Sequence, residues 1–110
     1  MSQQFYIAIV LYESASTASD YQSLYEEEMV LVEASTEEEA RAKGLEYAKH
    51  QESSYLNDSG ETITQRFKCL VDVQQVLYDQ FKDGTPLYAR HFRNLDAYQA
   101  FEPLLSGKEL

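Results

Sequence analysis

The stretch from Glu61 to Tyr78 shows the clearest alternation of apolar and polar residues in the chain. Side chains of a β-strand point alternately to its two faces, so a half-buried strand repeats its apolar residues at every second position. This pattern predicts a long antiparallel strand that is bent or bulged. The apolar parity carries Ile63, Phe67, Cys69, Val71, Val73 and Leu77, and the polar parity carries Thr62, Thr64, Arg66, Lys68, Asp72 and Gln74.

Two further strands are expected near the start of the chain. Residues 5–12, "FYIAIVLY", are apolar on both parities, which indicates an interior strand covered on both sides. Residues 25–34 resume β character after residues 13–23, a segment rich in Ser, Thr and Ala without a periodic apolar face. We expect a hairpin of two strands joined by a long, mobile loop.

The segment "ASTEEEA" changes the period from strand to helix. Ser35 or Thr36 can cap a helix, and a glutamate stands three positions after each of them, at Glu38 and Glu39. The stripe that follows contains small residues, which would let the helix approach the sheet closely. Its members are Ala40, Gly44, Tyr47, Ala48 and, at the far end, Tyr55, before a turn at residues 57–60.

The last third of the chain predicts a hairpin and a short helix. Asp83-Gly84 is a strong turn signal, and residues 87–92, "LYARHF", would form the return strand. Asn94 can cap a helix over residues 95–101 that Pro103 ends. The order β-β-α-β-β-α predicts an α+β fold with about four antiparallel strands and two helices on one face, as a single domain over residues 1–110.

Composition excludes several classes of partner. A formal net charge of -10 repels nucleic acid and anionic membranes, and apolar runs such as "IAIVLY" are too short to cross a bilayer. One cysteine, Cys69, allows no internal disulfide, and no signal peptide opens the chain, so we expect a cytoplasmic protein. Because Cys69 falls on the apolar parity, its thiol is expected to be buried and inert.

The acidic triplets 26–28 and 37–39 do not predict a metal site. Neighbouring side chains diverge on a strand and fan out on a helix, so neither triplet can gather three carboxylates around one ion. His50 and His91 lie on different expected elements, and no nucleophile, base and oxyanion donor are assembled. We therefore expect no catalytic residue, no metal and no cofactor, and a protein that is not an enzyme.

The best candidate contact surface borders the Ser-rich segment. Tyr12, Tyr21 and Tyr25 flank it, while Glu26 and Glu28 share one strand face, and tyrosine suits protein interfaces. The same rings can instead pack at the strand ends. We favour a non-enzymatic protein-interaction module that is a homo-oligomer. An immunity-type protein that neutralises a basic toxin, and an enzyme or small-ligand-binding domain without a recognisable motif, remain as alternatives.

Four segments together resemble a small bacterial family, the domain-of-unknown-function family 4288. They are "FYIAIVLYE", "LYEEEMVLVEASTEEEARAKG", "NDSGE" followed by "RFKCLVDVQQVL", and "DGTPLYARHF", which span roughly residues 5–93. Pro86 stands where the family pattern suggests an acidic residue, and proline supplies neither charge nor a backbone donor. The resemblance implies no activity, substrate or catalytic residue.

Overall fold

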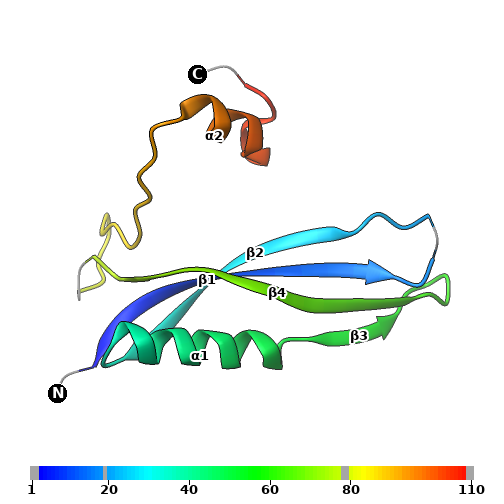
Figure 1. Ribbon diagram of the computed structural model, residues 1–110, viewed down its shortest axis with the longest axis horizontal. Coiled ribbons are helices and arrows are strands. Elements are labelled where there is room, and N and C mark those ends of the chain that lie inside the picture. The colour runs from blue at the N-terminus through cyan, green and yellow to red at the C-terminus, as the bar shows by residue number, and fades with distance from the viewer. Residues whose placement is uncertain (1–2, 19, 78–79, 109–110) are drawn as a thin grey trace.

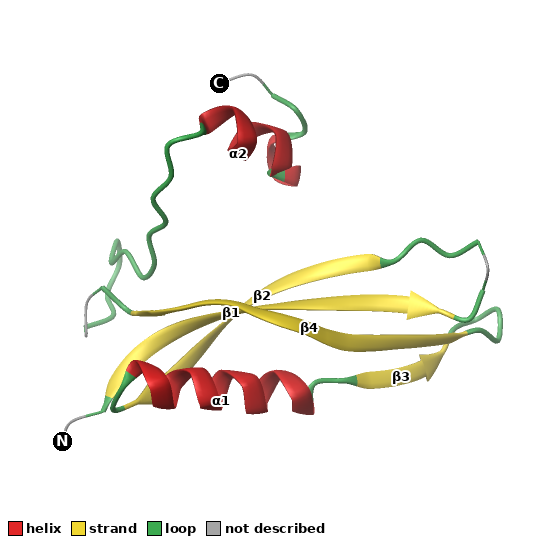
Figure 2. Ribbon diagram, viewed as in Figure 1, coloured by secondary structure: helices red, strands yellow, loops and turns green. Residues whose placement is uncertain are grey.

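The computed structural model describes residues 3–18, 20–77 and 80–108. Its four strands and two α-helices follow one another in the predicted order β-β-α-β-β-α (Figures 1 and 2). A single 3₁₀ turn, η1, follows the second helix. The elements are β1 (Gln4–Ser16), β2 (Leu24–Ala34), α1 (Glu37–His50), β3 (Ser53–Leu56), β4 (Thr62–Gln75), α2 (Leu95–Phe101) and η1 (Pro103–Leu105).

The four strands form one antiparallel sheet in the order β2-β1-β4-β3. β1 is interior, as its two apolar parities predict. Its residues Tyr6, Ala8 and Val10 are buried on the side that α1 covers, and Ile7 and Ile9 are buried on the other side. We call the side of the sheet opposite α1 the open face.

The first hairpin is longer than predicted. β1 continues to Ser16, where Glu13 pairs with Tyr25 and Ser14 pairs with Leu24. Residues 13–16 therefore belong to a strand and not to a loop. Their composition favours a loop, but pairing with β2 on one side and β4 on the other satisfies their backbone groups, and this tertiary context outweighs local preference.

α1 begins and packs as the sequence predicts. The Thr36 side chain caps it by accepting a hydrogen bond of 3.1 Å from the Glu39 backbone N–H. Its buried residues are Ala40, Gly44 and Ala48. A Cβ atom added at Gly44 would lie 3.2 Å from Ala8 Cβ, closer than comfortable carbon contact, so glycine is what permits this approach.

β4 is bulged, and the bulges overturn one prediction. Its register against β1 shifts between Ile9 and Val10 and again between Leu11 and Tyr12. Each shift inserts an unpaired residue and reverses the alternation beyond it. Cys69 consequently pairs with Leu11 on the open face and is exposed, so the prediction of a buried thiol is wrong. Tyr78, the end of the predicted strand, lies outside the described residues.

β3 was not expected from the sequence. Tyr55 belongs to this strand and not to the helical stripe, because α1 ends at His50 and residues 53–56 pair with residues 62–65. The turn between β3 and β4 is stabilised by Asn57, whose Oδ1 accepts hydrogen bonds from the backbone N–H groups of Ser59 and Glu61. β3 therefore supplies the fourth strand of the sheet.

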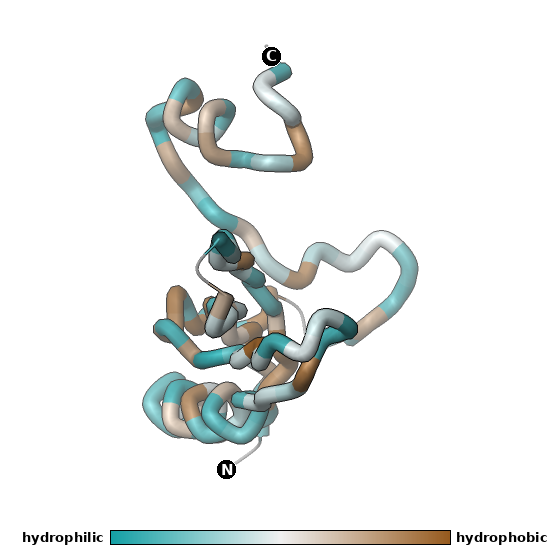
Figure 3. The backbone as a smooth tube through the Cα atoms, turned by 90° about the vertical axis from the view of Figure 1, so that its right-hand side faces the viewer, coloured by the Kyte–Doolittle hydropathy of each residue, from teal (hydrophilic) through white to brown (hydrophobic). Residues whose placement is uncertain are grey.

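The predicted return strand at residues 87–92 is absent, since these described residues have no regular structure. They belong to a long connection that leads from β4 to α2 (Figure 2). α1 covers one face of the sheet as predicted, whereas α2 lies beyond the other face and apart from it (Figures 1 and 3). The radius of gyration is 17.3 Å, against about 13 Å for a compact chain of this length.

Candidate functional site

The connection to α2 is anchored on the open face. Val76 packs with Ile7 and Ile9, and its backbone N–H donates to the Phe5 carbonyl at 2.8 Å. The Phe81 ring contacts the Phe5 ring edge-on, with centroids 5.3 Å apart. These contacts bury the centre of β1 and leave much of β2 uncovered.

Tyr88 makes the strongest polar contact of this anchor. Its hydroxyl donates to the Asp72 carboxylate at 2.5 Å, while Asp72 also accepts from the Val73 backbone N–H and the Gln74 amide. Burial first, and then the hydrogen bond to Asp72, raise the pKa of Tyr88 to about 12. A neutral phenol thus ties the connection to β4 at any physiological pH.

Beyond Tyr88, a cleft of about 590 Å³ lies between β2 and α2. The Phe92 and Tyr98 rings stack on one of its walls, with centroids 4.8 Å apart and planes 14° from parallel. Charged side chains of both signs also line it. The lining residues are Glu27, Tyr88, Arg90, His91, Phe92, Asn94, Ala97, Tyr98, Phe101 and Glu102. The sequence predicted a strand for "LYARHF" and gave no sign that it lines a cleft.

Large apolar side chains on both sides of this cleft are exposed. On the open face of β2, Tyr25, Met29 and Leu31 are 57%, 58% and 53% exposed. On and after α2, Phe101 and Leu104 are 73% and 91% exposed. Such a density of uncovered apolar surface is typical of an interaction site.

The five residues predicted to bind a partner do not form one surface. Tyr12 is buried on the α1 side, and Glu26 and Glu28 point to that same side because they pair with Tyr12 and Val10. Tyr25 points to the open face, and Tyr21 lies in the connection between β1 and β2. Tyr21, Tyr25 and Glu26 are exposed, so these three remain the accessible members of the predicted set.

Tyr12 occupies an unusual polar environment. Burial is the main reason that the pKa of Tyr12 is raised to about 12, and the charges of Glu28 and Glu26 add to it. Within the described part of the chain, neither the Tyr12 hydroxyl nor the buried Oε1 of Glu28 has a hydrogen-bond partner. Burying such a group is costly, which makes this position informative for stability.

Tyr25 is held at the rim of the open face. Its hydroxyl donates to Glu13 Oε2 at 3.2 Å, and Lys68 Nζ lies 3.3 Å from Glu13 Oε1. A hydrogen bond from Ser23, followed by those from Lys68 and Tyr25, lowers the pKa of the Glu13 carboxyl. These contacts tie the Tyr25 ring to β1 at the end of the open face away from Met29.

One glutamate triplet lies on an edge strand of the sheet, and the other lies at the start of a helix. Glu26, Glu27 and Glu28 lie on β2, an edge strand, where charge opposes edge-to-edge pairing. Glu37, Glu38 and Glu39 form the first turn of α1 and complement its dipole. Among the residues whose positions are described, no three His, Cys, Asp or Glu side chains group closely enough to hold a metal ion.

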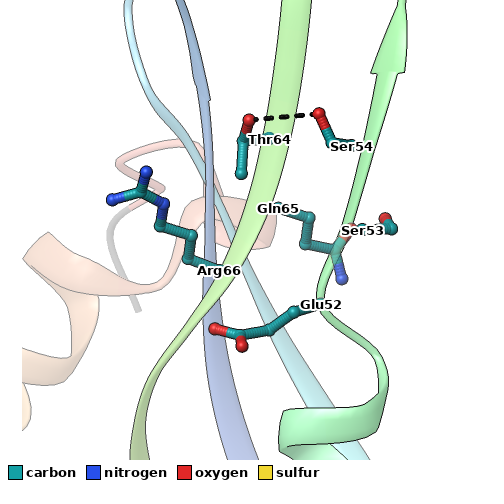
Figure 4. Close-up of a pocket in the computed structure, with 6 residues that line it drawn as sticks. All are labelled: Glu52, Ser53, Ser54, Thr64, Gln65 and Arg66. Carbon is teal, nitrogen blue, oxygen red and sulfur yellow. Dashed lines mark hydrogen bonds between the residues drawn. The ribbon is translucent and has the colours of Figure 1, made fainter.

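A second, shallower depression of about 350 Å³ lies at the β3 edge of the sheet. Figure 4 shows Arg66 extending to one side of β4 and Gln65 to the other, so the polar groups do not converge. Ser54 and Thr64 hydroxyls bond to each other at 3.5 Å, and Glu52 accepts from the Phe67 backbone N–H. This arrangement pairs neither hydroxyl with a base.

No helix within residues 3–18, 20–77 and 80–108 is both long and apolar enough to span a bilayer. The known proteins add one relationship. No curated protein and no solved structure matches the chain. A family model matches residues 5–89, which include the sheet from Phe5 onward, α1 and the Tyr88 anchor but end before α2. By this match the chain belongs to the family described as "Domain of unknown function (DUF4288)".

Proposed function

We propose that the protein is a non-enzymatic protein-interaction module that self-associates as a homo-oligomer. The observation that carries this proposal is surplus surface. The exposed area is 8400 Å², whereas a folded monomer of 12.7 kDa exposes roughly 6,200 Å², which leaves an excess of about 2,200 Å². Covering this surface in a complex would recover the hydrophobic stabilisation that a single copy forgoes.

The chemical character of the surplus surface supports the same proposal. Aromatic residues and methionine are enriched at protein interfaces, and Tyr25, Met29, Phe92 and Phe101 are all exposed on or next to the open face. A rim of charged residues, including Glu27 and Arg90, surrounds them. An apolar centre with a polar rim is the usual composition of a specific interface.

A second candidate is binding to a basic protein, such as a toxin that this protein would neutralise. The net charge of -10 favours it, as do the exposed acids of β2, an edge strand that offers unpaired backbone groups. In this case Tyr21, Tyr25 and Glu26 would be the accessible members of the predicted contact set. The proposal also includes residence in the cytoplasm, where a single exposed thiol such as Cys69 stays reduced.

Light scattering coupled to size-exclusion chromatography tests self-association directly. We expect a dimer or higher oligomer at micromolar concentration. Salt separates the two candidates, because it screens repulsion between two chains of charge -10 but weakens attraction to a basic partner. Self-association should therefore persist or strengthen from low to moderate salt. A strictly monomeric protein at every concentration and salt would refute the proposal.

A further inference from the structure

We propose that two copies of the protein exchange α2, so that the helix of each copy packs on the open face of the other. This inference rests on the proposed self-association and adds its geometry. It assigns the uncovered apolar surfaces of β2 and α2 to one reciprocal contact. The supporting observations concern the helix, the sheet, the connection between them, the area involved and the charges.

The helix needs a surface to pack against. α2 has seven residues, and isolated helices shorter than about 12 residues are marginal in water. None of its residues is buried, although Leu95, Tyr98 and Phe101 form a stripe at helical spacing. Leu104 in the following 3₁₀ turn extends the same apolar set. An amphipathic helix of this length gains its stability by burying that stripe.

The open face offers a matching surface. Met29 and Leu31 stand opposite Ile9 and Ile7 in the sheet, so their exposed side chains continue a row that the chain's own connection already covers in part. Glu27 follows Met29 on this face, and Tyr25 lies beyond it, bonded to Glu13. A seven-residue helix is about 10 Å long, so laid along β2 it would cover the neighbouring side chains of Met29 and Leu31.

In a single copy the helix stands apart from this surface (Figure 1). Tyr88 is tied to Asp72, and the residues after it lead away from the sheet before α2 begins (Figures 1 and 3). The cleft of about 590 Å³ that remains shows that α2 does not seat on its own sheet. A second copy carries the same helix and the same face, so a twofold exchange satisfies both pairs at once and leaves neither uncovered.

The area agrees with a dimer of this kind. If a dimer buried the whole surplus of about 2,200 Å² on each copy, the interface would bury roughly 4,400 Å² in total. This total lies within the range of about 2,000 to 5,000 Å² for obligate homodimers. A smaller contact between flat surfaces would leave most of the surplus exposed. Exchange of a helix engages both uncovered surfaces of each copy.

Charge complements the exchange. Arg90, His91 and Arg93 are the local concentration of bases in the chain, and they directly precede α2 and would move with it. Glu27 and Glu33 lie on the open face of β2, opposite Leu11 and Phe5. Within one copy Arg90 and His91 border the same cleft as Glu27, and after exchange they would border the corresponding acid of the partner, so the match of charges is kept.

Complementation by mixing tests the exchange. Phe101→Glu places a charge in the helix, and Leu31→Glu places one on the face. Both residues are exposed in a single copy, so the fold should tolerate the changes, which circular dichroism would check. We expect each variant alone to be monomeric by light scattering. An equimolar mixture should restore a heterodimer, because one intact helix can then pack on one intact face.

The control for these variants is Tyr55→Glu. Tyr55 is 59% exposed, but it pairs with Ile63 on the α1 side of the sheet, so the dimer should persist. A helix variant that remains dimeric would refute the exchange and leave self-association standing. A wild-type protein that is monomeric throughout would refute both proposals.

Cross-linking gives a readout that does not depend on weakening the dimer. Cys69 is exposed on the open face, and Ala97→Cys would add one thiol beside the apolar stripe of α2. A short bismaleimide is expected to join the two thiols between chains and give a covalent dimer on a denaturing gel. Cross-linking within one chain would show that α2 folds back on its own sheet and would refute exchange. Glu46→Cys on α1, on the opposite side of the sheet, is the control expected to yield neither product.

Discussion

Two tyrosines with equally raised pKa values are expected to respond in opposite ways to replacement by phenylalanine. The pKa of each is about 12, and burial is the main cause in both. The Tyr88 hydroxyl donates to Asp72 at 2.5 Å, whereas the Tyr12 hydroxyl is buried without a partner among the described residues. The substitutions Tyr12→Phe and Tyr88→Phe therefore separate the cost of burying a hydroxyl from the benefit of bonding it.

The magnitudes follow from the two environments. A buried hydroxyl without a hydrogen bond costs about 1 to 3 kcal/mol, so Tyr12→Phe should raise the free energy of unfolding by about 1 kcal/mol. A hydrogen bond to a charged acceptor contributes about 1.5 to 3 kcal/mol. Tyr88 is only partly buried and Asp72 keeps two other donors, so Tyr88→Phe should lower the free energy of unfolding by about 1.5 kcal/mol.

Urea denaturation at neutral pH and one fixed protein concentration measures both changes. The m value should be the same for each variant, so that a shift of the midpoint reports stability alone. Tyr21→Phe, at an exposed position, is the control and should leave the midpoint unchanged. If Tyr12→Phe destabilises as much as Tyr88→Phe, the Tyr12 hydroxyl is satisfied in the folded protein and the reasoning is refuted.

Three more predictions concern the helix and the alkaline range. Gly44→Ala should lower the free energy of unfolding by about 1 to 2 kcal/mol in urea denaturation, because the new Cβ would meet Ala8 Cβ at 3.2 Å on a fixed backbone. The control is Ala42→Gly, which measures the loss of helix propensity alone. If Gly44→Ala stabilises the protein by as much as Ala42→Gly destabilises it, close packing at Gly44 is contradicted. Thr36→Ala should cost about 1 kcal/mol, whereas Ser35→Ala should cost almost nothing, since only Thr36 accepts from the helix; equal losses would contradict this assignment of the cap. The pKa of Tyr12 and of Tyr88 is raised from 10.0 to about 12, so the stability linked to these phenols is complete below pH 10 and lost as pH rises toward 12. Between these pH values the urea midpoint of the variant with both tyrosines replaced by Phe should fall less than that of the wild-type protein. An equal fall in both proteins would contradict the raised pKa values.

The sequence predicted those features of the fold that depend on a residue's near neighbours in the chain. Residues 5–12 are apolar on both parities, and the strand that contains them is interior. Thr36 and the glutamates after it mark the start of α1, and Gly44 lies where the helix approaches the sheet most closely. Local hydrogen bonds and one amphipathic period determine these features, and both can be read from a short segment.

The bulges of β4 could be expected, but their positions could not. A bulge inserts one residue, and the alternation beyond it continues in the opposite phase. The shift at Val71 left that residue exposed and turned Cys69 toward the open face, although both share parity with the buried Val73, and the second shift restores the phase at Phe67. Nothing in the alternation itself distinguishes a regular strand from one that changes phase twice.

The candidate site depended on contacts between distant segments. Residues 87–92 have the composition of a strand, but Tyr88 finds its partner sixteen residues earlier at Asp72, and β3 takes the place of the fourth strand. The cleft between β2 and α2 arises from this long-range anchor. Of the predicted contact residues, Tyr12 turned inward because β1 continues past it and α1 packs above it.

One copy of the protein folds and still leaves the apolar stripe of α2 exposed. The spacing of Leu95, Tyr98 and Phe101 is that of a buried helix face, yet all three are exposed. In an oligomer, a partner's surface buries a side chain as effectively as its own chain does. Residues that have a core pattern and an exposed position are therefore the ones that the proposed self-association would bury. Here they lie on α2 and on the open face of β2, the two surfaces that a reciprocal exchange would bring together.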